Sequence, residues 1–286
     1  MPTPPDADQH ARSRIELNPP GRHATSEVVE ASPRPDLRTY VDRYVGYRDA
    51  QGSVRRRELP SPTVTLIVSF GHALHITDPR TGGTTRRTSF AAGLHDHWVF
   101  TETMGQEGVQ INLTPVGAYT ILGVPMNELT NHAVELASIL GTGADDLAFQ
   151  LAELPTWEDR FHLLDHVLAN RMTTGHVPAP TTRWVWNRIR ETSGKVEIET
   201  LVRELGCSRK HISERFRVEV GITPKSLARL SRFDRAVGLL RRGENALADI
   251  AVSSGYYDQA HLNREVREFA GVSPLTLGTA FRSSAV

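Results

Sequence analysis

The chain has 286 residues, 39% of them hydrophobic and 23% charged, which is the composition of a globular protein long enough for two domains. It contains no run of about eighteen uncharged apolar residues, which excludes a membrane-spanning helix, and its single cysteine, Cys207, excludes an internal disulfide and a multi-thiolate zinc site. The net charge is zero, but residues 183–286 carry 18 Lys and Arg against 12 Asp and Glu, whereas residues 1–182 carry 15 against 21. This asymmetry has two interpretations: a C-terminal module that binds a polyanion, or two domains whose solvated surfaces differ in charge.

The first half of the chain is predicted to be a tail followed by strands. Residues 1–35 are rich in proline and polar side chains and are predicted to be disordered; they contain no apolar segment typical of a secretory signal, so a cytoplasmic location is expected. The stretch Leu37–Tyr47 fits a helix and a strand equally well. A β-branched run at Val64–Phe70 and the alternation of apolar and polar residues over 109–113 predict strands between about 59 and 113, the last with one buried face.

Helices are predicted from about Leu129 onward. Thr156 and Asp159 have the spacing of a capping box, and the helix after them carries an apolar stripe that is interpreted as core, with a dimer seam as the alternative; the stripe is Phe161, Leu164 and Leu168. Residues 173–181 are predicted to be a linker. The predicted organisation is therefore a tail at 1–35, an N-terminal domain at 36–172, to which the family resemblance described below gives a sensor or dimerisation role, the linker, and an all-helical domain at 182–286.

The helical part contains an internal repeat. Leu201–Gly206 and Ile250–Gly255 each end an amphipathic helix with a glycine, which can adopt the left-handed conformation that turns the chain. Each glycine is followed by a polar capping residue, Ser208 or Asp258, and by a second amphipathic helix. Each copy then closes with a Gly-(Ile/Val)-(Thr/Ser)-Pro turn, at 221–224 and 271–274. This repeat predicts a duplicated helix-turn-helix.

The segment between the two copies is predicted to be one long helix. Thr223 and Pro224 suit its start, Gly243 suits its end, and an apolar stripe runs along it. About 19 residues of helix span roughly 28 Å, and B-DNA repeats every 34 Å or so. A rigid connector of this length is consistent with two reading helices in successive major grooves on one face of the duplex.

These motifs resemble the DNA-binding domain of the AraC/XylS family of transcription regulators, which carries two helix-turn-helix units joined by a long helix. The resemblance covers about 183–282 and rests on LGCS at 205–208, GITP at 221–224, RFDRAV at 232–237, DIA at 249–251, GYYDQAHLNR at 255–264 and GVSP at 271–274. Three positions where the family often has phenylalanine are occupied by Tyr256, Leu262 and Val266. Leu277-Gly278 replaces an aromatic–basic pair, so the last helix matches least well.

The resemblance implies that the second helix of each unit reads DNA. It places base contacts at Lys210, Ser213 and Glu214 and at Gln259, His261, Asn263 and Arg264, whereas Arg209, Arg215, Lys225 and Arg267 are interpreted as phosphate contacts. Arginine can donate hydrogen bonds to guanine, the side-chain amides of Asn and Gln can pair with adenine, and glutamate can accept a hydrogen bond from cytosine. The alternative is that these residues form ordinary solvated helix faces. The predicted DNA-binding residues are Ser208, Arg209, Lys210, Ser213, Glu214, Arg217, Asp258, Gln259, His261, Asn263, Arg264 and Arg267.

Two weaker patterns carry alternative hypotheses. His95, His97 and Glu102 have the His-x-His…Glu form of a metal site and a partial likeness to a cupin motif, although a turn with incidental histidines is the favoured interpretation and no cofactor is predicted. Cys207 falls in the turn of the first unit, where a small buried hydrophobic side chain is favoured over a redox-sensing thiol.

The sequence thus predicts a multidomain α+β protein: a β-rich, cupin-like or other α/β sensor domain, and an all-α domain with two helix-turn-helix units joined by a long helix. The expected function is sequence-specific transcription regulation, with double-stranded DNA as the partner and no enzymatic activity. The resemblance also implies a small-molecule effector, RNA polymerase and a second copy of the chain as further partners. The alternatives are a cupin-like metal-dependent enzyme with a DNA-binding appendage and a sequence-neutral architectural DNA binder.

Overall fold

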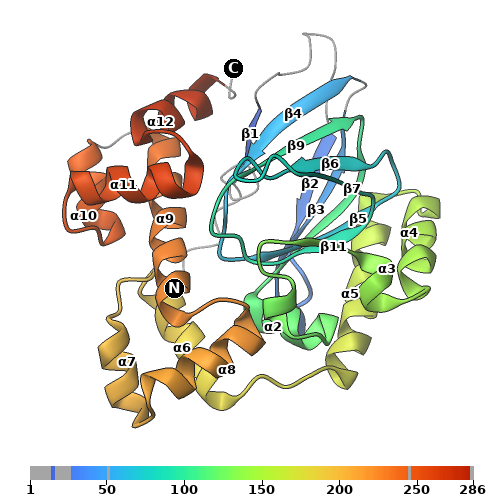
Figure 1. Cartoon of the computed structure of the whole chain (residues 1–286). Coiled ribbons are helices and arrows are strands. Elements are labelled where there is room, and N and C mark those ends of the chain that lie inside the picture. Colours follow the sequence, from blue (N-terminus) through green and yellow to red (C-terminus); the bar gives the residue numbers. More distant parts are fainter. Residues whose placement is uncertain (1–13, 17–26, 50–51, 244–245, 284–286) are drawn as a thin grey trace.

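The computed structural model describes residues 14–16, 27–49, 52–243 and 246–283. Its first part contains two antiparallel sheets (Figure 1). The five-stranded sheet has the order β1 (Arg14–Glu16), β4 (Ser53–Glu58), β9 (Val99–Met104), β6 (Leu74–Thr77) and β7 (Thr84–Arg87). The six-stranded sheet has the order β11 (Ala133–Glu135), β8 (Phe90–Ala92), β5 (Val64–Ser69), β10 (Glu107–Leu113), β3 (Val41–Arg48) and β2 (Glu27–Ala31). The predicted strands between 59 and 113 are confirmed.

The pleat of β10 explains how the N-terminal domain is layered. Val109, Ile111 and Leu113 are fully buried and join the hydrophobic core that the helices cover, as the alternation predicts. Gln110 and Asn112 point to the other face, where they line a cavity opposite the five-stranded sheet. The helices that follow in this domain are α2 (Pro115–Leu122), α3 (Leu136–Leu140), α4 (Gly143–Glu153) and α5 (Trp157–Thr174), with 3-10 turns η1 (Pro35–Leu37) and η2 (Met126–Glu128).

The structure of the N-terminal domain corrects two of the predictions from the sequence and settles a third point that they left open. The predicted disordered tail is wrong for 14–16, where β1 pairs with β4, and for 27–31, where β2 pairs with β3 and extends the sheet beyond the expected boundary at 36. Residues 1–13 and 17–26 lie outside the described part. The stretch Leu37–Tyr47, which fitted a helix and a strand equally well, is a strand from Val41 onward, β3, and Leu37 ends the 3-10 turn η1. Helix α2 begins at Pro115, before the expected position, because proline suits a first turn and Thr114 caps it by accepting from the backbone N–H of Gly117 at 3.0 Å.

The capping box and the apolar stripe of α5 are confirmed. The Thr156 hydroxyl accepts a hydrogen bond from the backbone N–H of Asp159 at 3.1 Å. Phe161, Leu164 and Leu168 are buried in the core, as the favoured interpretation expected, and do not form an exposed seam. No helix in the described ranges is long and apolar enough to cross a lipid bilayer.

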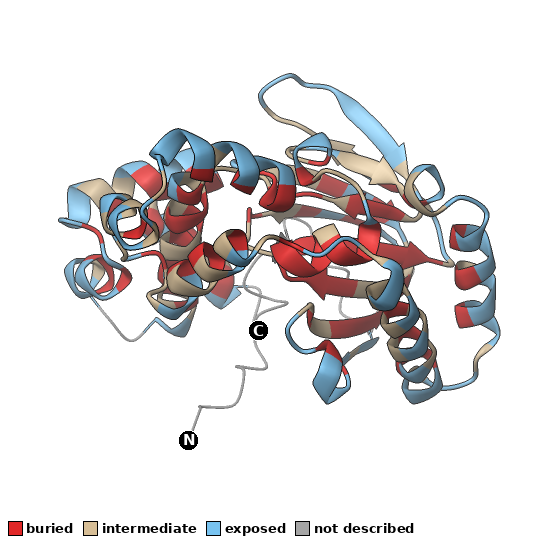
Figure 2. Cartoon of the chain, turned by 90° about the horizontal axis from the view of Figure 1, so that it is seen from below, coloured by how far each residue is buried: buried red, intermediate tan, exposed pale blue. Residues whose placement is uncertain are grey.

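Beyond the linker the described chain is helical, as predicted, and contains the two expected units. The first unit comprises α6 (Pro180–Glu191), α7 (Ile198–Leu205) and α8 (Arg209–Val220), and the second comprises α10 (Leu247–Ser254), α11 (Gln259–Ala270) and α12 (Pro274–Ser283). Helix α9 (Pro224–Arg242) has the 19 residues expected of the connector and runs between the units (Figure 1). Its apolar side is buried, and Figure 2 shows the exposed faces of the surrounding helices turned outward.

The hydrophobic cores do not follow the domain boundary. One core runs from the six-stranded sheet through α2 and α5 into α6, α8 and the start of α9, so the first helix-turn-helix unit shares it with the N-terminal domain. The second unit has a separate core around Phe233, Leu262 and Phe269, to which Leu59 of the N-terminal domain contributes. The N-terminal domain therefore packs against both units.

Candidate DNA-reading helices and a cavity between the sheets

The two predicted reading helices, α8 and α11, begin in the same way. The Ser208 hydroxyl accepts from the backbone N–H of His211 at 3.2 Å, and the Asp258 carboxylate accepts from the backbone N–H of His261 at 2.6 Å. Ser208 and Asp258 are therefore N-caps, as the repeat predicts. Each accepts a hydrogen bond from a backbone N–H that has no partner within the helix. Before each cap, Gly206 and Gly255 adopt left-handed conformations, with φ of 63° and 81°, that turn the chain between the helices.

Each reading helix buries one side and exposes the other. Ile212 and Phe216 of α8, and Leu262 and Val266 of α11, face the core. The predicted contact residues that lie exposed at the surface are Ser208, Arg209, Lys210, Glu214, Arg217, Asp258, Gln259, Arg264 and Arg267. Ser213, His261 and Asn263 lie half-buried at the edge of this surface. Most of the predicted residues of each unit are therefore accessible from solvent.

Several of these side chains already have partners within the protein. Lys210 Nζ lies 3.8 Å from a carboxylate oxygen of Glu214, and Arg209 Nη1 lies 3.1 Å from Glu199. Both pairs are largely exposed, so each contributes little to folding and exchanges readily for a contact with DNA. The Asn263 side-chain oxygen is shielded from solvent without a hydrogen-bond partner among the described residues. Because the oxygen is covered, Asn263 has to change rotamer before it can accept from an adenine amino group.

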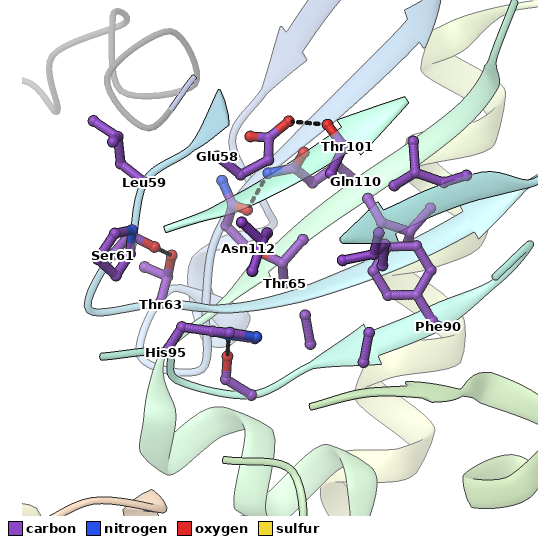
Figure 3. Close-up of a pocket in the computed structure, with 18 of the residues that line it drawn as sticks. Glu58, Leu59, Ser61, Thr63, Thr65, Phe90, His95, Thr101, Gln110 and Asn112 are labelled. Carbon is purple, nitrogen blue, oxygen red and sulfur yellow. Dashed lines mark hydrogen bonds between the residues drawn. The ribbon is translucent and has the colours of Figure 1, made fainter. Parts of the chain in front are cut away.

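A cavity of about 160 Å³ lies between the two sheets of the N-terminal domain. One end is apolar and includes Leu74, Ile76 and Phe90. Toward the other end the Thr101 hydroxyl donates to Glu58 at 3.0 Å, and Gln110 donates to Asn112 at 2.7 Å (Figure 3). Asp234 of α9 also lines the cavity, so its wall includes a residue of the helical domain.

His95 lies at the cavity as a neutral side chain. Burial lowers the pKa of its imidazole from 6.5 to about 4, because the charged form is poorly solvated there. The Nδ1 atom of His95 lies 2.8 Å from the carbonyl oxygen of Gly93, which holds the ring in place. The cavity therefore offers amide, hydroxyl and neutral imidazole groups beside an apolar surface, the lining expected of a site for a small amphipathic molecule.

The metal hypothesis for His95, His97 and Glu102 is not supported. His95 and His97 line the cavity with ring centroids 5.9 Å apart, but Glu102 is exposed and accepts from the Ser53 hydroxyl at 3.2 Å. Alternation along β9 is the cause: Thr101 faces the cavity, so its neighbour Glu102 faces away. Within the ranges that the structure describes, no three His, Cys, Asp or Glu side chains are grouped to hold a metal ion.

Comparisons with known proteins bear on both halves of the chain. Residues 201–279 match the family model described as a helix-turn-helix domain. The C-terminal domain is an AraC-type helix-turn-helix domain. Through this domain the chain is similar to DNA-binding transcription regulators of the AraC type. Residues 29–135 match a family described as a domain of unknown function, DUF6597, and no match was found among curated protein sequences.

Solved structures with detectable similarity include three regulators. ToxT from Vibrio cholerae O395 is 12% identical with a TM-score of 0.46, over 90% of this chain and 98% of that one. The C-terminal domain of AraT, a response regulator from Geobacillus stearothermophilus, is 24% identical with a TM-score of 0.34, over 36% and 86%. The AraC-like transcriptional activator CuxR is 12% identical with a TM-score of 0.37, over 73% and 82%.

The AraC-type domain exposes two further side chains that sequence reasoning missed. His211 is exposed beside the cap of α8, and Tyr257 is 92% exposed immediately before the cap of α11. The repeat itself contained the signal for His211, because the 50-residue offset pairs it with His261. The sequence gives no such indication for Tyr257. Only the structure shows that Tyr257 is exposed whereas the neighbouring Tyr256 is buried.

The last helix of the AraC-type domain forms despite its unusual sequence. Leu277 is fully buried and Gly278 is buried beside it, so α12 packs on the second core without the aromatic–basic pair. Cys207 is half-buried in the turn of the first unit, and its redox role stays untested.

Proposed function

We propose that this regulator binds a specific DNA sequence by inserting α8 and α11 into successive major grooves. The observation that carries the proposal is the matched exposure of the two N-terminal helix halves, each beginning at a side-chain cap and lined with hydrogen-bonding side chains. Helix α9 has 19 residues and is therefore roughly 28 Å long, which is of the same order as the groove repeat of about 34 Å.

The chemistry of the exposed residues divides them into two roles. Lys210, Ser213, Glu214, Gln259, His261, Asn263 and Arg264 are proposed to contact bases. Arg209, Arg215, Lys225 and Arg267 are proposed to contact phosphates, which set affinity and register but carry no sequence information. Arg217 lies exposed on α8, one turn after Ser213. From this position it is proposed to contact either a base edge or a DNA phosphate. Ser208 and Asp258 orient the helices by capping them.

The N-terminal domain is proposed to bind a small-molecule effector in the cavity between its sheets. The support is the combination of an apolar end, a polar end and a wall residue, Asp234, that belongs to the DNA-binding domain. A ligand in contact with both domains has a direct way to change how they sit together. RNA polymerase and a second copy of the chain are further partners that the family resemblance suggests.

A binding-site selection with the full-length protein and random duplexes tests the DNA-binding role. Enrichment of one motif with two half-sites about one helical turn apart is the expected result. Competition at fixed salt should then show at least about a thousandfold preference for that motif over unrelated DNA. Equal competition by unrelated DNA would favour the architectural alternative and refute sequence-specific reading.

A further inference from the structure

The N-terminal domain contacts both helix-turn-helix units, and in both it contacts the turn that follows the reading helix. In the first unit the Thr130 hydroxyl donates to the carbonyl oxygen of Gly221 at 2.9 Å. A Cβ atom added to Gly221 would lie 2.9 Å from that hydroxyl and 3.1 Å from the carbonyl oxygen of Met126, so the turn fits closely against η2. Gly221 ends α8, and the carbonyl groups at a helix end need donors from outside the helix.

In the second unit the equivalent turn is held from the outer face of the five-stranded sheet. Arg57 Nη1 of β4 donates to the carbonyl oxygen of Ala270, the last residue of α11, at 3.0 Å. Trp98 covers Gly271 so closely that a Cβ atom there would overlap its indole ring. The Arg57 guanidinium also lies 4.3 Å from the centre of the Trp98 ring. A cation at this position faces the negative end of the helix dipole. Partial burial lowers the pKa of the Arg57 guanidinium, because the charged form is less well solvated there.

Gly221 and Gly271 are the same position of the duplicated unit, 50 residues apart. We propose that Thr130 on one side and Arg57 with Trp98 on the other form a double clamp, by which the N-terminal domain fixes the relative position of the two reading helices. The proposal rests on the proposed function, because the position of the helices matters only for a DNA-binding protein. Without the clamp, the second unit would still be held by α9, by the Leu59 contact and by Lys195, which lies against Gly255.

The clamp leaves the reading residues free. It holds the C-terminal ends of α8 and α11, whereas Lys210, Glu214, Gln259 and Arg264 lie exposed toward the N-terminal ends. The clamp therefore restricts how far the units can tilt or separate, and does not cover the surface that reads DNA. A protein with restricted units should bind best to one half-site spacing and poorly to others, because adjustment would require the clamp to open.

The clamp also shares a strand with the cavity. On β9 the side chains of Val99 and Thr101 line the cavity, whereas Phe100 and the preceding Trp98 lie on the opposite face beside Arg57. A ligand that displaces β9 from inside would move Trp98 against Gly271. A displacement of β9 by a ligand in the cavity would thus act directly on the turn that follows α11.

The first test uses the free protein and needs no DNA. Hydrogen exchange is measured for the amides of α10–α12 in full-length wild type, Arg57→Ala and Trp98→Leu, with Arg55→Ala as the matched control. Arg55 lies on the same face of β4, 4.2 Å from the Phe100 ring centre, and has no hydrogen bond to α11 among the described residues. We expect about tenfold faster exchange in α10–α12 for the two clamp variants and no change for Arg55→Ala. Exchange in Arg57→Ala equal to that in Arg55→Ala would overturn the clamp.

The second test measures Kd for the selected operator and for versions with one or two base pairs inserted between the half-sites. Wild type should lose affinity steeply with each insertion, whereas Arg57→Ala and the isosteric Thr130→Val should lose at least threefold less. An unchanged insertion penalty in both variants would refute the idea that the clamp sets the spacing. Failure of the proposed function is recognised separately, because wild type would then bind no operator although the exchange difference in the free protein persists.

Discussion

Replacement of Arg264 by alanine gives the sharpest test of base reading by the second unit. The side chain is exposed on α11, so its removal should change the free energy of unfolding by no more than about 0.5 kcal/mol. The loss should therefore appear in binding. An arginine paired with a guanine contributes about 1–3 kcal/mol of discrimination, which corresponds to a Kd increase of about 5- to 150-fold on the cognate operator.

The measurement is a titration of the full-length protein with the selected operator and with a set of single base-pair variants, at one salt concentration. Arg264→Ala should bind the cognate site more weakly and bind all four base pairs at one operator position with nearly equal affinity. Arg183→Ala serves as the control, because Arg183 is exposed on α6, which is not one of the two reading helices. Weaker binding by Arg264→Ala that is equal for every operator variant and for random DNA would refute base reading by this residue.

Further predictions concern the phosphate contacts, the caps, the core and the cavity. Arg267→Ala should weaken binding uniformly across sequences and lower the slope of log Kd against log salt by about one, as measured by titrations at several salt concentrations. Asp258→Ala removes the 2.6 Å cap of α11 and should lower the free energy of unfolding by about 1 kcal/mol in urea denaturation, whereas Asp258→Asn should retain most of it. Leu262→Ala should cost about 2–5 kcal/mol in the same assay, because the side chain is fully buried in the second core; a cost below 1 kcal/mol would contradict that packing. Since the pKa of His95 is about 4 when folded and near 6.5 when unfolded, the unfolded chain takes up a proton first as the pH falls. The free energy of unfolding should therefore decrease by up to about 3 kcal/mol between pH 6.5 and 4, and comparison with His95→Gln should isolate that contribution.

The helical domain was predictable because its signals are local. A cap and the N–H it satisfies are three residues apart, as with Asp258 and His261, and a glycine at a helix end acts on the turn that it belongs to. The duplication repeated these signals at an offset of 49 or 50 residues, so each unit supported the interpretation of the other. The apolar spacing of α9 gave its length of 19 residues for the same reason.

Predictions of the N-terminal domain were less complete because its structure depends on pairing between distant segments. Residues 27–31 look like a continuation of a polar tail and become a strand only because β3 offers an edge to pair with. The His95, His97 and Glu102 pattern suggested one site, but the pleat of β9 sends Glu102 to the opposite face. Neither outcome can be read from neighbouring residues alone.

The sequence by itself determined that this protein carries two helix-turn-helix units joined by a long helix, and which side of each second helix would be buried in the core. Tertiary structure alone decided that the cavity lies between two sheets with Asp234 in its wall, and that Arg57 and Thr130 reach the ends of the two reading helices. Arg57 and Ala270 are 213 residues apart in the chain. No local preference encodes such a contact, which exists because two packed surfaces bring a guanidinium to an unpaired helix carbonyl.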